Sequence, residues 1–344
     1  MSARGMGRHW ARTRILLAGV LGAACSNAGA DRILTIPGQA QVSGFIYLDR
    51  NGNGIFDGAA PGDTALVGAK VRLIAKGTVD TVALVTSDVG ALVGGNPVNL
   101  KFGPVTVGSY RVVVDTLTIP HDSMRVAQID SVVSATPGST PYVQIGISFP
   151  AVTATAARAL PLRTKVFLVG VALADANTFG DSTNSFADAS GAIRVTQIKP
   201  TTVVGVGDSD RVLGTVDTLG GQRVLRAVSV FQLTFGATTP ITTLTVGQAK
   251  TANGGVADAA LVTFSGRLVI LDTATGPAGR IIHVKDTTAS LIDTLELHLD
   301  STAIDSVSMK RDTVGARLHF RGILFPSSVP GRWLLKPRAP ADQF

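Results

Sequence analysis

The sequence predicts an all-β protein built from several small modules. Three observations support this fold class: Val and Thr are abundant, long helical patterns are absent, and short apolar–polar alternations recur, as in residues 110–114 and 317–320. Branched side chains suit a pleated sheet, and alternation with a period of two is typical of a half-buried strand. Gly, Pro, Asn and Asp interrupt these runs about every ten residues, a spacing typical of β-sandwiches and β-barrels.

The N-terminus has the layout of a secretory signal. Residues 1–24 contain four arginines, no acidic residue and the apolar run Ile15 to Ala24. This run has the length of a signal-peptide core and is shorter than the roughly 20 apolar residues of a membrane-spanning helix. The next residue, Cys25, is the only cysteine of the chain, and a lone thiol at this position favours a chemical use. The alternative is a simple signal cut near Ala24 or Ala30, with a leftover thiol.

The stretch from Gly22 to Ser26 resembles a bacterial lipobox, with one departure. That motif usually has Leu three residues before the Cys, whereas here Leu21 stands four residues before it. The resemblance implies that Cys25 is lipidated and that residues 25–40 form a tether to a membrane, which becomes a partner through the lipid anchor. Ser26 after the Cys implies the outer membrane or the cell surface in a Gram-negative host.

The charge balance changes once the signal is removed. The chain carries 31 basic and 24 acidic residues, a formal net charge of +7. Without the four arginines of residues 1–24, 27 basic residues face 24 acidic ones. The high pI therefore belongs largely to the signal and does not by itself indicate a nucleic-acid partner. With no second cysteine available for a disulfide, apolar cores must stabilise the two or three domains that the length predicts.

The first module is expected over residues 41–149. Its landmarks are the loop 49–57, Pro61-Gly62, the turn 87–90 and Gly108-Ser109-Tyr110. In this order they resemble the SdrD B-like repeat, an immunoglobulin-like β-sandwich of bacterial surface proteins. The resemblance implies an extracellular sandwich for this module.

The loop of this module also has the pattern of a weak calcium site. Oxygen-bearing side chains alternate along it, and a glycine at position 54 permits a sharp turn, as in calcium loops generally. The predicted ligands are Asp49, Asn51, Asn53, Ile55 through its carbonyl, Asp57 and Asp63. The family often has Glu where this chain has Ala60, so Asp63 or Asp88 would have to close the site. The alternative is an Asn/Asp/Gly turn that caps itself by side-chain hydrogen bonds.

After a linker predicted over 150–161, a weak internal repeat indicates two similar units, 162–240 and 241–344. Gly170 and Gly266 are 96 residues apart within similar strand-like runs, and Asp188 and Asp286 are 98 residues apart. Each unit resembles a bacterial OB-fold. The resemblance implies two small β-barrels, each starting with a long bent strand that carries a glycine.

The second unit carries the strongest candidate binding surface. Seven basic residues lie between positions 310 and 338, opposed there only by Asp312. The predicted ligand-binding residues are Arg317, Arg321, Arg332, Trp333 and Lys336. OB-folds bind oligonucleotides or oligosaccharides on one face, so nucleic acid and anionic glycan are both possible ligands. The third interpretation is a solvated sheet face, lying against water or anionic lipid.

The sequence does not predict an enzyme. The five histidines are scattered without metal-ligand spacing, and neither a Gly-x-Ser-x-Gly elbow nor a phosphate-binding loop is present. We therefore expect a non-catalytic envelope lipoprotein that acts in surface scaffolding, adhesion or ligand binding, with envelope proteins or glycans as partners. The alternative is a nucleic-acid-binding accessory protein of an extracellular nuclease system.

Overall fold

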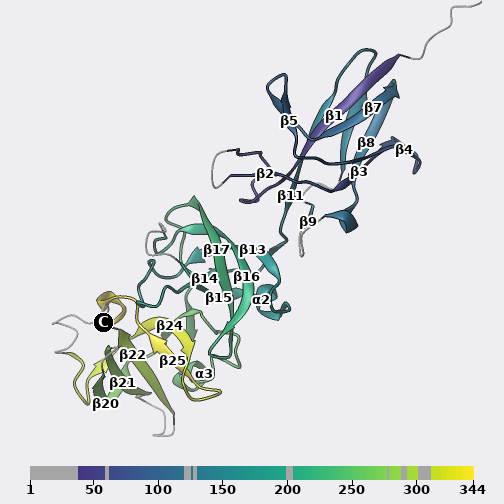
Figure 1. Ribbon diagram of the computed structural model, residues 1–344. Helices are drawn as coiled ribbons and strands as arrows, with labels where there is room; N and C mark the ends of the chain where they lie inside the picture. The colour runs from purple at the N-terminus through teal and green to yellow at the C-terminus, as the bar shows by residue number, and fades with distance from the viewer. Residues whose placement is uncertain are drawn as a thin grey trace, which may run out of the picture.

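The computed structural model describes residues 38–58, 62–119, 125–126, 130–198, 204–276, 279–287, 293–300 and 311–344. The predicted signal peptide, Cys25 and the tether up to residue 37 lie outside these ranges. The predicted fold class is confirmed: the chain is all-β, with an immunoglobulin-like sandwich followed by two OB-like barrels. Figure 1 shows the sandwich (purple to blue) leading into the two barrels (teal to yellow).

The sandwich consists of two sheets that enclose one apolar core. One sheet has the order β2-β1-β11-β9, with β7 also paired to β1, and the other has the order β10-β8-β3-β4. The bounds of its strands and of one 3-10 helix are β1 Gln39–Leu48, β2 Thr64–Ala65, β3 Lys70–Ala75, β4 Thr81–Thr86, β5 Ala91–Val93, β6 Asn96–Val98, β7 Leu100–Thr106, β8 Gly108–Val114, η1 Thr116–Thr118, β9 Arg125–Val126, β10 Asp130–Ala135 and β11 Tyr142–Ser148.

Alternation explains why these segments form a sandwich. In β8, Tyr110, Val112 and Val114 are buried, and the residues between them are more exposed. Because side chains of a strand point to opposite faces in turn, one face of each sheet is apolar and packs on the other sheet. One buried polar residue, Asn99, is satisfied by the backbone: it accepts from Ile46 N (2.8 Å) and donates to Ile46 O (2.8 Å).

The first barrel is a closed sheet of five strands. Its elements are β12 Ala151–Val152, α2 Ala154–Ala159, β13 Lys165–Ala172, β14 Asn184–Asp188, β15 Gly191–Thr196, β16 Ser209–Leu219 and β17 Gln222–Thr234. The order is β13-β14-β15-β17-β16, and β13 also pairs with β16, which closes the barrel. Only β15 and β17 pair in parallel within this ring. Numbered from β13, this is the 1-2-3-5-4-1 order of an OB-like barrel.

The predicted linker over 150–161 differs from the structure, because most of it belongs to the first barrel. β12 pairs in parallel with β13, and α2 follows it. Thr153 caps the helix by accepting from Ala156 N, and Ala154 and Ala157 are fully buried in the core of the barrel. A six-residue helix is too short to show the 3.6-residue period in a sequence, so its Ala-rich stretch has the composition of a linker.

The second barrel repeats the plan of the first. Its elements are β18 Thr242–Leu244, α3 Val246–Ala249, β19 Leu261–Phe264, β20 Leu268–Gly276, β21 Gly279–Asp286, β22 Thr294–Asp300, β23 Arg317–Leu318, β24 Arg321–Pro326, β25 Trp333–Lys336 and η2 Pro340–Asp342. In the strand numbering used for the first barrel, β19 and β20 together correspond to the first strand, and β23 and β24 together correspond to the fourth. The pairings of β19 with β24 and of β20 with β23 then close the same 1-2-3-5-4-1 order.

The two barrels share an apolar interface. A cluster of buried residues joins Leu173, Ala174, Phe179, Ala187 and Ala192 of the first barrel to Ala259, Leu261, Ile323, Phe325 and Leu334 of the second. The rings of Phe179 and Phe325 meet edge to face, with centroids 5.2 Å apart. Arg338 of the second barrel donates to Leu173 O (2.6 Å). The second barrel therefore covers β14, β15 and the β13–β14 connection, the part of an OB-like barrel that often binds ligands.

A smaller contact joins the sandwich to the first barrel. Arg211 in β16 donates to Asn51 O at 2.7 Å, and the rings of Phe149 and Phe167 lie edge to face. The loop 49–57 therefore lies against the first barrel. Among the described residues, no helix has both the length and the apolar character needed to cross a membrane.

Candidate ligand-binding cleft between the barrels

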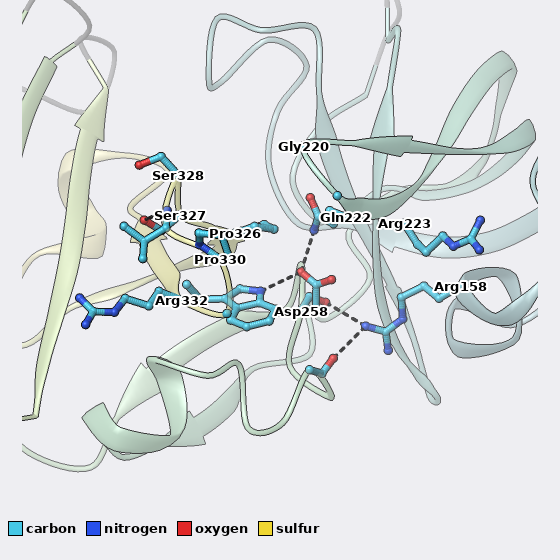
Figure 2. A pocket seen from close by; sticks show the side chains of 15 residues that line it. Arg158, Gly220, Gln222, Arg223, Asp258, Pro326, Ser327, Ser328, Pro330 and Arg332 are labelled. Atoms are coloured by element: carbon cyan, nitrogen blue, oxygen red, sulfur yellow. Dashed lines mark hydrogen bonds between the residues drawn. The ribbon is translucent and has the colours of Figure 1, made fainter.

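A cleft of about 660 Å³ lies where the two barrels meet. The connection between the fourth and fifth strands lines it in each barrel: Gly220-Gly221 between β16 and β17, and residues 327–332 between β24 and β25. Arg158 of α2 and Asp258 complete its floor and sides (Figure 2). Ligand pockets usually measure about 300–1,000 Å³, so this cleft has the size of an ordinary small-molecule or oligomer subsite.

Asp258 joins the two barrels at the cleft. Its Oδ1 accepts from Gln222 Nε2 of the first barrel (2.7 Å) and from Trp333 Nε1 of the second (3.2 Å). Burial raises the pKa of the Asp258 carboxyl, while these two hydrogen bonds and the nearby Arg158 act in the opposite direction. Arg158 Nη1 also donates to the carbonyls of Gly255 (3.3 Å) and Asp258 (3.5 Å). The polar contacts of Figure 2 therefore fix the indole and the two barrels together.

The lining of the cleft is positively charged. The residues that line it include three arginines, Arg158, Arg223 and Arg332, and one acidic residue, Asp258. Figure 2 shows Arg158 and Arg223 on one side of Asp258 and Arg332 on the other. Among the described residues, Gln222 Oε1 and Arg223 Nη1 are buried without a hydrogen-bond partner. The residues that line the cleft therefore carry an excess of positive charge, which favours an anionic ligand.

Two glycines keep one edge of the cleft free of side chains. Gly220 and Gly221 have φ of +57° and +82°, a region that L residues with a side chain rarely adopt. A Cβ atom at either position would meet no atom within 4 Å. The backbone of this turn is therefore open to close approach by a ligand.

The structure does not bring the predicted basic residues onto one surface. Arg321 pairs with the buried Asp342 at 2.7 Å, and Lys336 pairs with Asp300 at 3.0 Å. Arg317 is exposed on β23, whereas only Arg332 and Trp333 line the cleft. The basic run is therefore divided, because acidic residues outside it in sequence lie beside it in the fold.

Lys336 and Arg338 are further used within the fold. Lys336 Nζ lies 5.4 Å and 5.9 Å from the ring centres of Phe179 and Phe325, and Arg338 forms a second ion pair with Asp342. These arginines hold the pKa of the Asp342 carboxyl below its ordinary value, although burial of that carboxyl acts to raise it. Lys310 lies outside the described residues.

The predicted calcium loop has most of its oxygen atoms engaged internally. Asp49 accepts from Gly52 N (2.6 Å) and Gly54 N (2.8 Å), and Asp57 Oδ2 accepts from the side-chain amides of Asn51 (2.8 Å) and Asn53 (2.7 Å). These are the contacts of a self-capped turn. Among the described residues, no group of three or more His, Cys, Asp or Glu side chains is arranged to hold a metal ion.

Asp63 closes this loop through its backbone contacts. It accepts from Arg50 N (2.8 Å) and Asp57 N (2.9 Å). Burial raises the pKa of the Asp63 carboxyl despite these hydrogen bonds. Ile55, predicted to offer a carbonyl, is exposed. Calcium binding by the loop remains a prediction.

Sequence reasoning did not find a row of acids and histidines on the second barrel. In register across β20, β21 and β22 stand Asp272, His283 and Glu296. His283 Nδ1 lies 2.5 Å from Asp272 Oδ1, and His298 contacts Glu296. Recognising β20–β22 as consecutive antiparallel strands would have placed these residues on one face, although they are far apart in sequence.

Comparisons with known proteins complete the description of the site. Neither the protein-family models nor the curated proteins contain a match to the chain. Among solved structures, the hypothetical protein ygiW from E. coli is similar, with 23% identity over 25% of this chain and 97% of that chain and a TM-score of 0.21. The p202 HIN2 structure has 11% identity over 53% and 92%, with a TM-score of 0.26. A streptococcal ancillary pilin has 11% identity over 58% and 60%, with a TM-score of 0.21.

These similarities are too weak to assign a family or a ligand. The fold and the site define the class of protein by themselves: an all-β chain in which a sandwich precedes two fused OB-like barrels with a shared, arginine-lined cleft.

Proposed function

We propose that this chain is an exported, lipid-anchored and non-catalytic binding protein. The sandwich holds the fused barrels away from the membrane, and the barrels bind a ligand in the cleft between them. One observation carries this proposal: the β16–β17 and β24–β25 connections, one from each barrel, line the same positively charged cleft. Connections of this kind bind ligands in many OB-like barrels, and here two of them face a common volume.

Trp333 offers a direct test of binding in the cleft. The chain has two tryptophans, and Trp10 lies in the predicted signal peptide, so in a Trp10→Phe variant all tryptophan fluorescence comes from the cleft whether or not the signal has been removed. We would titrate this variant with tetragalacturonic acid, maltotetraose and octathymidylate. We expect a saturable fluorescence change with at least one of them, because a ligand in the cleft alters the surroundings of the indole.

A matched pair of substitutions locates the signal. Ser328→Phe adds bulk to the cleft lining and is expected to abolish the change, whereas Ser134→Phe makes the same substitution at an exposed position of the sandwich and is expected to preserve it. A flat titration with all three ligands contradicts the proposed function. So does a change that survives Ser328→Phe at full amplitude.

The anchor is tested separately. Cys25→Ser is expected to abolish incorporation of labelled palmitate and to move the chain from the membrane to the soluble fraction, because no other cysteine is available. Ser26→Ala, which keeps the thiol, serves as the control for acylation. Mass spectrometry of the native protein that finds Met1 intact, or Cys25 without fatty acid, contradicts the anchoring proposal.

A further inference from the structure

We infer that the ligand of the cleft is an acidic oligosaccharide, held by arginines at its carboxylate and by Trp333 at one sugar ring. This inference rests on the proposed function and names the ligand class of the same cleft. Three features of the lining carry it: its charge, its single aromatic side chain, and its supply of groups that pair with hydroxyls.

The net positive charge of the residues that line the cleft favours a ligand with an acidic group. Three arginines and one aspartate line the cleft, which is a balance of two positive charges when Asp258 is ionised. Asp258 already accepts two hydrogen bonds, from Gln222 and Trp333. Arg223 and Arg332 lie on different sides of the cleft (Figure 2). A carboxylate can accept two parallel hydrogen bonds from one guanidinium, which makes arginine the preferred partner of such a group.

The aromatic content fits a sugar better than a nucleic-acid strand. Trp333 is the only aromatic residue among the described residues that line the cleft, and it is half-buried with its N–H held by Asp258. Pro326 and Pro330 extend the apolar surface beside it. An indole offers one flat apolar face, against which the C–H groups of a single sugar ring can pack. Single-stranded nucleic acids instead use several aromatic side chains that stack successive bases.

The surroundings of the cleft also disfavour a nucleic-acid strand. A strand needs a basic groove that follows its backbone over several nucleotides. In the first barrel, the usual binding strands β14 and β15 are covered by the second barrel. In the second, Arg321 and Lys336 are neutralised by Asp342 and Asp300. The basic residues of β24 and β25 therefore do not form a continuous basic groove.

Polar groups around the indole suit the hydroxyls of a sugar. The cleft is lined by Ser327 and Ser328 and by the open backbone of Gly220 and Gly221. Carbohydrates present many hydroxyls that both donate and accept, so a mixed lining of this kind pairs with them.

The test compares three ligands by Trp333 fluorescence in the Trp10→Phe variant. Tetragalacturonic acid and maltotetraose are both tetrasaccharides and differ in charge, and octathymidylate supplies phosphates with bases. We expect tetragalacturonic acid to bind at least tenfold more tightly than either of the others. We expect Arg223→Gln and Arg332→Gln each to weaken its binding by about tenfold, the effect of losing one charge-assisted hydrogen bond. Arg317→Gln, which removes the same charge from an exposed position outside the cleft, is expected to leave it within about twofold.

The outcomes separate this inference from the proposed function. Equal binding of maltotetraose, or tighter binding of octathymidylate, overturns the acidic oligosaccharide and leaves the cleft as a binding site. The inference is also overturned if Arg317→Gln weakens binding of tetragalacturonic acid as much as Arg332→Gln does. Such a result indicates that the overall charge of the protein attracts the ligand. A flat response to all three ligands contradicts both.

Discussion

At the scale of single residues, Asp210 is the most unusual ionisable group of the first barrel. It lies in β16 with no exposed surface, and among the described residues neither carboxyl oxygen has a hydrogen-bond partner. Burial, and then the charge of Asp208, raise the pKa of Asp210 to about 7. A buried carboxyl without partners is more stable in its protonated form, so the folded barrel holds a proton that the unfolded chain releases.

This raised pKa gives the stability of the barrel a defined pH dependence. Between about pH 4 and pH 7 the folded state binds more protons at this position than the unfolded state, so the free energy of unfolding falls as the pH rises. The contribution is fully present at the acidic end and is lost above pH 7. We expect Asp210→Asn to remove this slope and to stabilise the protein at pH 8 by roughly 1–4 kcal/mol, since each pKa unit corresponds to about 1.4 kcal/mol.

Denaturant unfolding at a series of pH values measures this effect. Asp217→Asn, in the same strand but half-exposed, is the matched control and should leave the slope as in the wild type. The two proteins are compared by how the free energy of unfolding changes between pH 5 and pH 8. The same slope in the wild type and in Asp210→Asn would contradict the raised pKa of Asp210.

Sequence reasoning identified individual residue types better than their partners. It singled out five residues from one short basic run: Arg317, which is exposed outside the cleft, and Arg321, Arg332, Trp333 and Lys336, of which Arg332 and Trp333 line the cleft. It could not see that Asp342 and Asp300 neutralise the other two. Charge pairs of this kind form between strands that are adjacent in the sheet, and a linear count of charges does not contain that information.

At the scale of elements, alternation was a reliable guide to the strands. The alternating run at residues 110–114 lies in β8, and the run at residues 317–320 begins with β23. The helices were missed because α2 and α3 each span fewer than two turns and derive their stability from capping and packing. Thr153 and Thr245, which cap these helices, were the available signal.

The bends that close the barrels depend on glycines at particular positions. A Cβ atom on Gly214 in β16 would lie 2.4 Å from Leu225 Cγ, and one on Gly322 in β24 would lie 2.6 Å from Lys336 O. Each glycine stands where the fourth strand of its barrel passes close to the fifth. The close approach that requires Gly214 and Gly322 is visible only in three dimensions.

At the scale of the whole molecule, the interface between the barrels is the feature on which the cleft depends. Phe325 is 3% exposed and lies against Phe179, and the guanidinium of Arg194 stacks 4.6 Å from its ring centre. The lining residues come from four separate stretches of sequence: Arg158, residues 220–223, residues 255–258 and residues 326–333. The cleft could not be predicted from the sequence, because none of these stretches forms a site alone.

We expect Phe325→Ala to uncouple the two barrels. Truncating a buried Phe costs about 3–5 kcal/mol, and here the loss falls on the contact between the barrels. Unfolding in denaturant, followed by Trp333 fluorescence and by far-UV circular dichroism, should then show two transitions that no longer coincide.

Phe235→Ala makes the same substitution at a position that is 76% exposed and should leave unfolding unchanged. Coincident transitions with a wild-type midpoint in Phe325→Ala would show that the interface does not couple the barrels.

The covered sheet of the first barrel has a consequence for stoichiometry. Two copies of one fold would ordinarily double the number of ligands bound, but here the second copy occupies the surface that the first would have offered. If the barrels bind a ligand as proposed, the repeat gives one shared binding site, and each chain should saturate at one equivalent of ligand. Avidity for a polymer would then have to come from several chains side by side, and not from the tandem barrels within one.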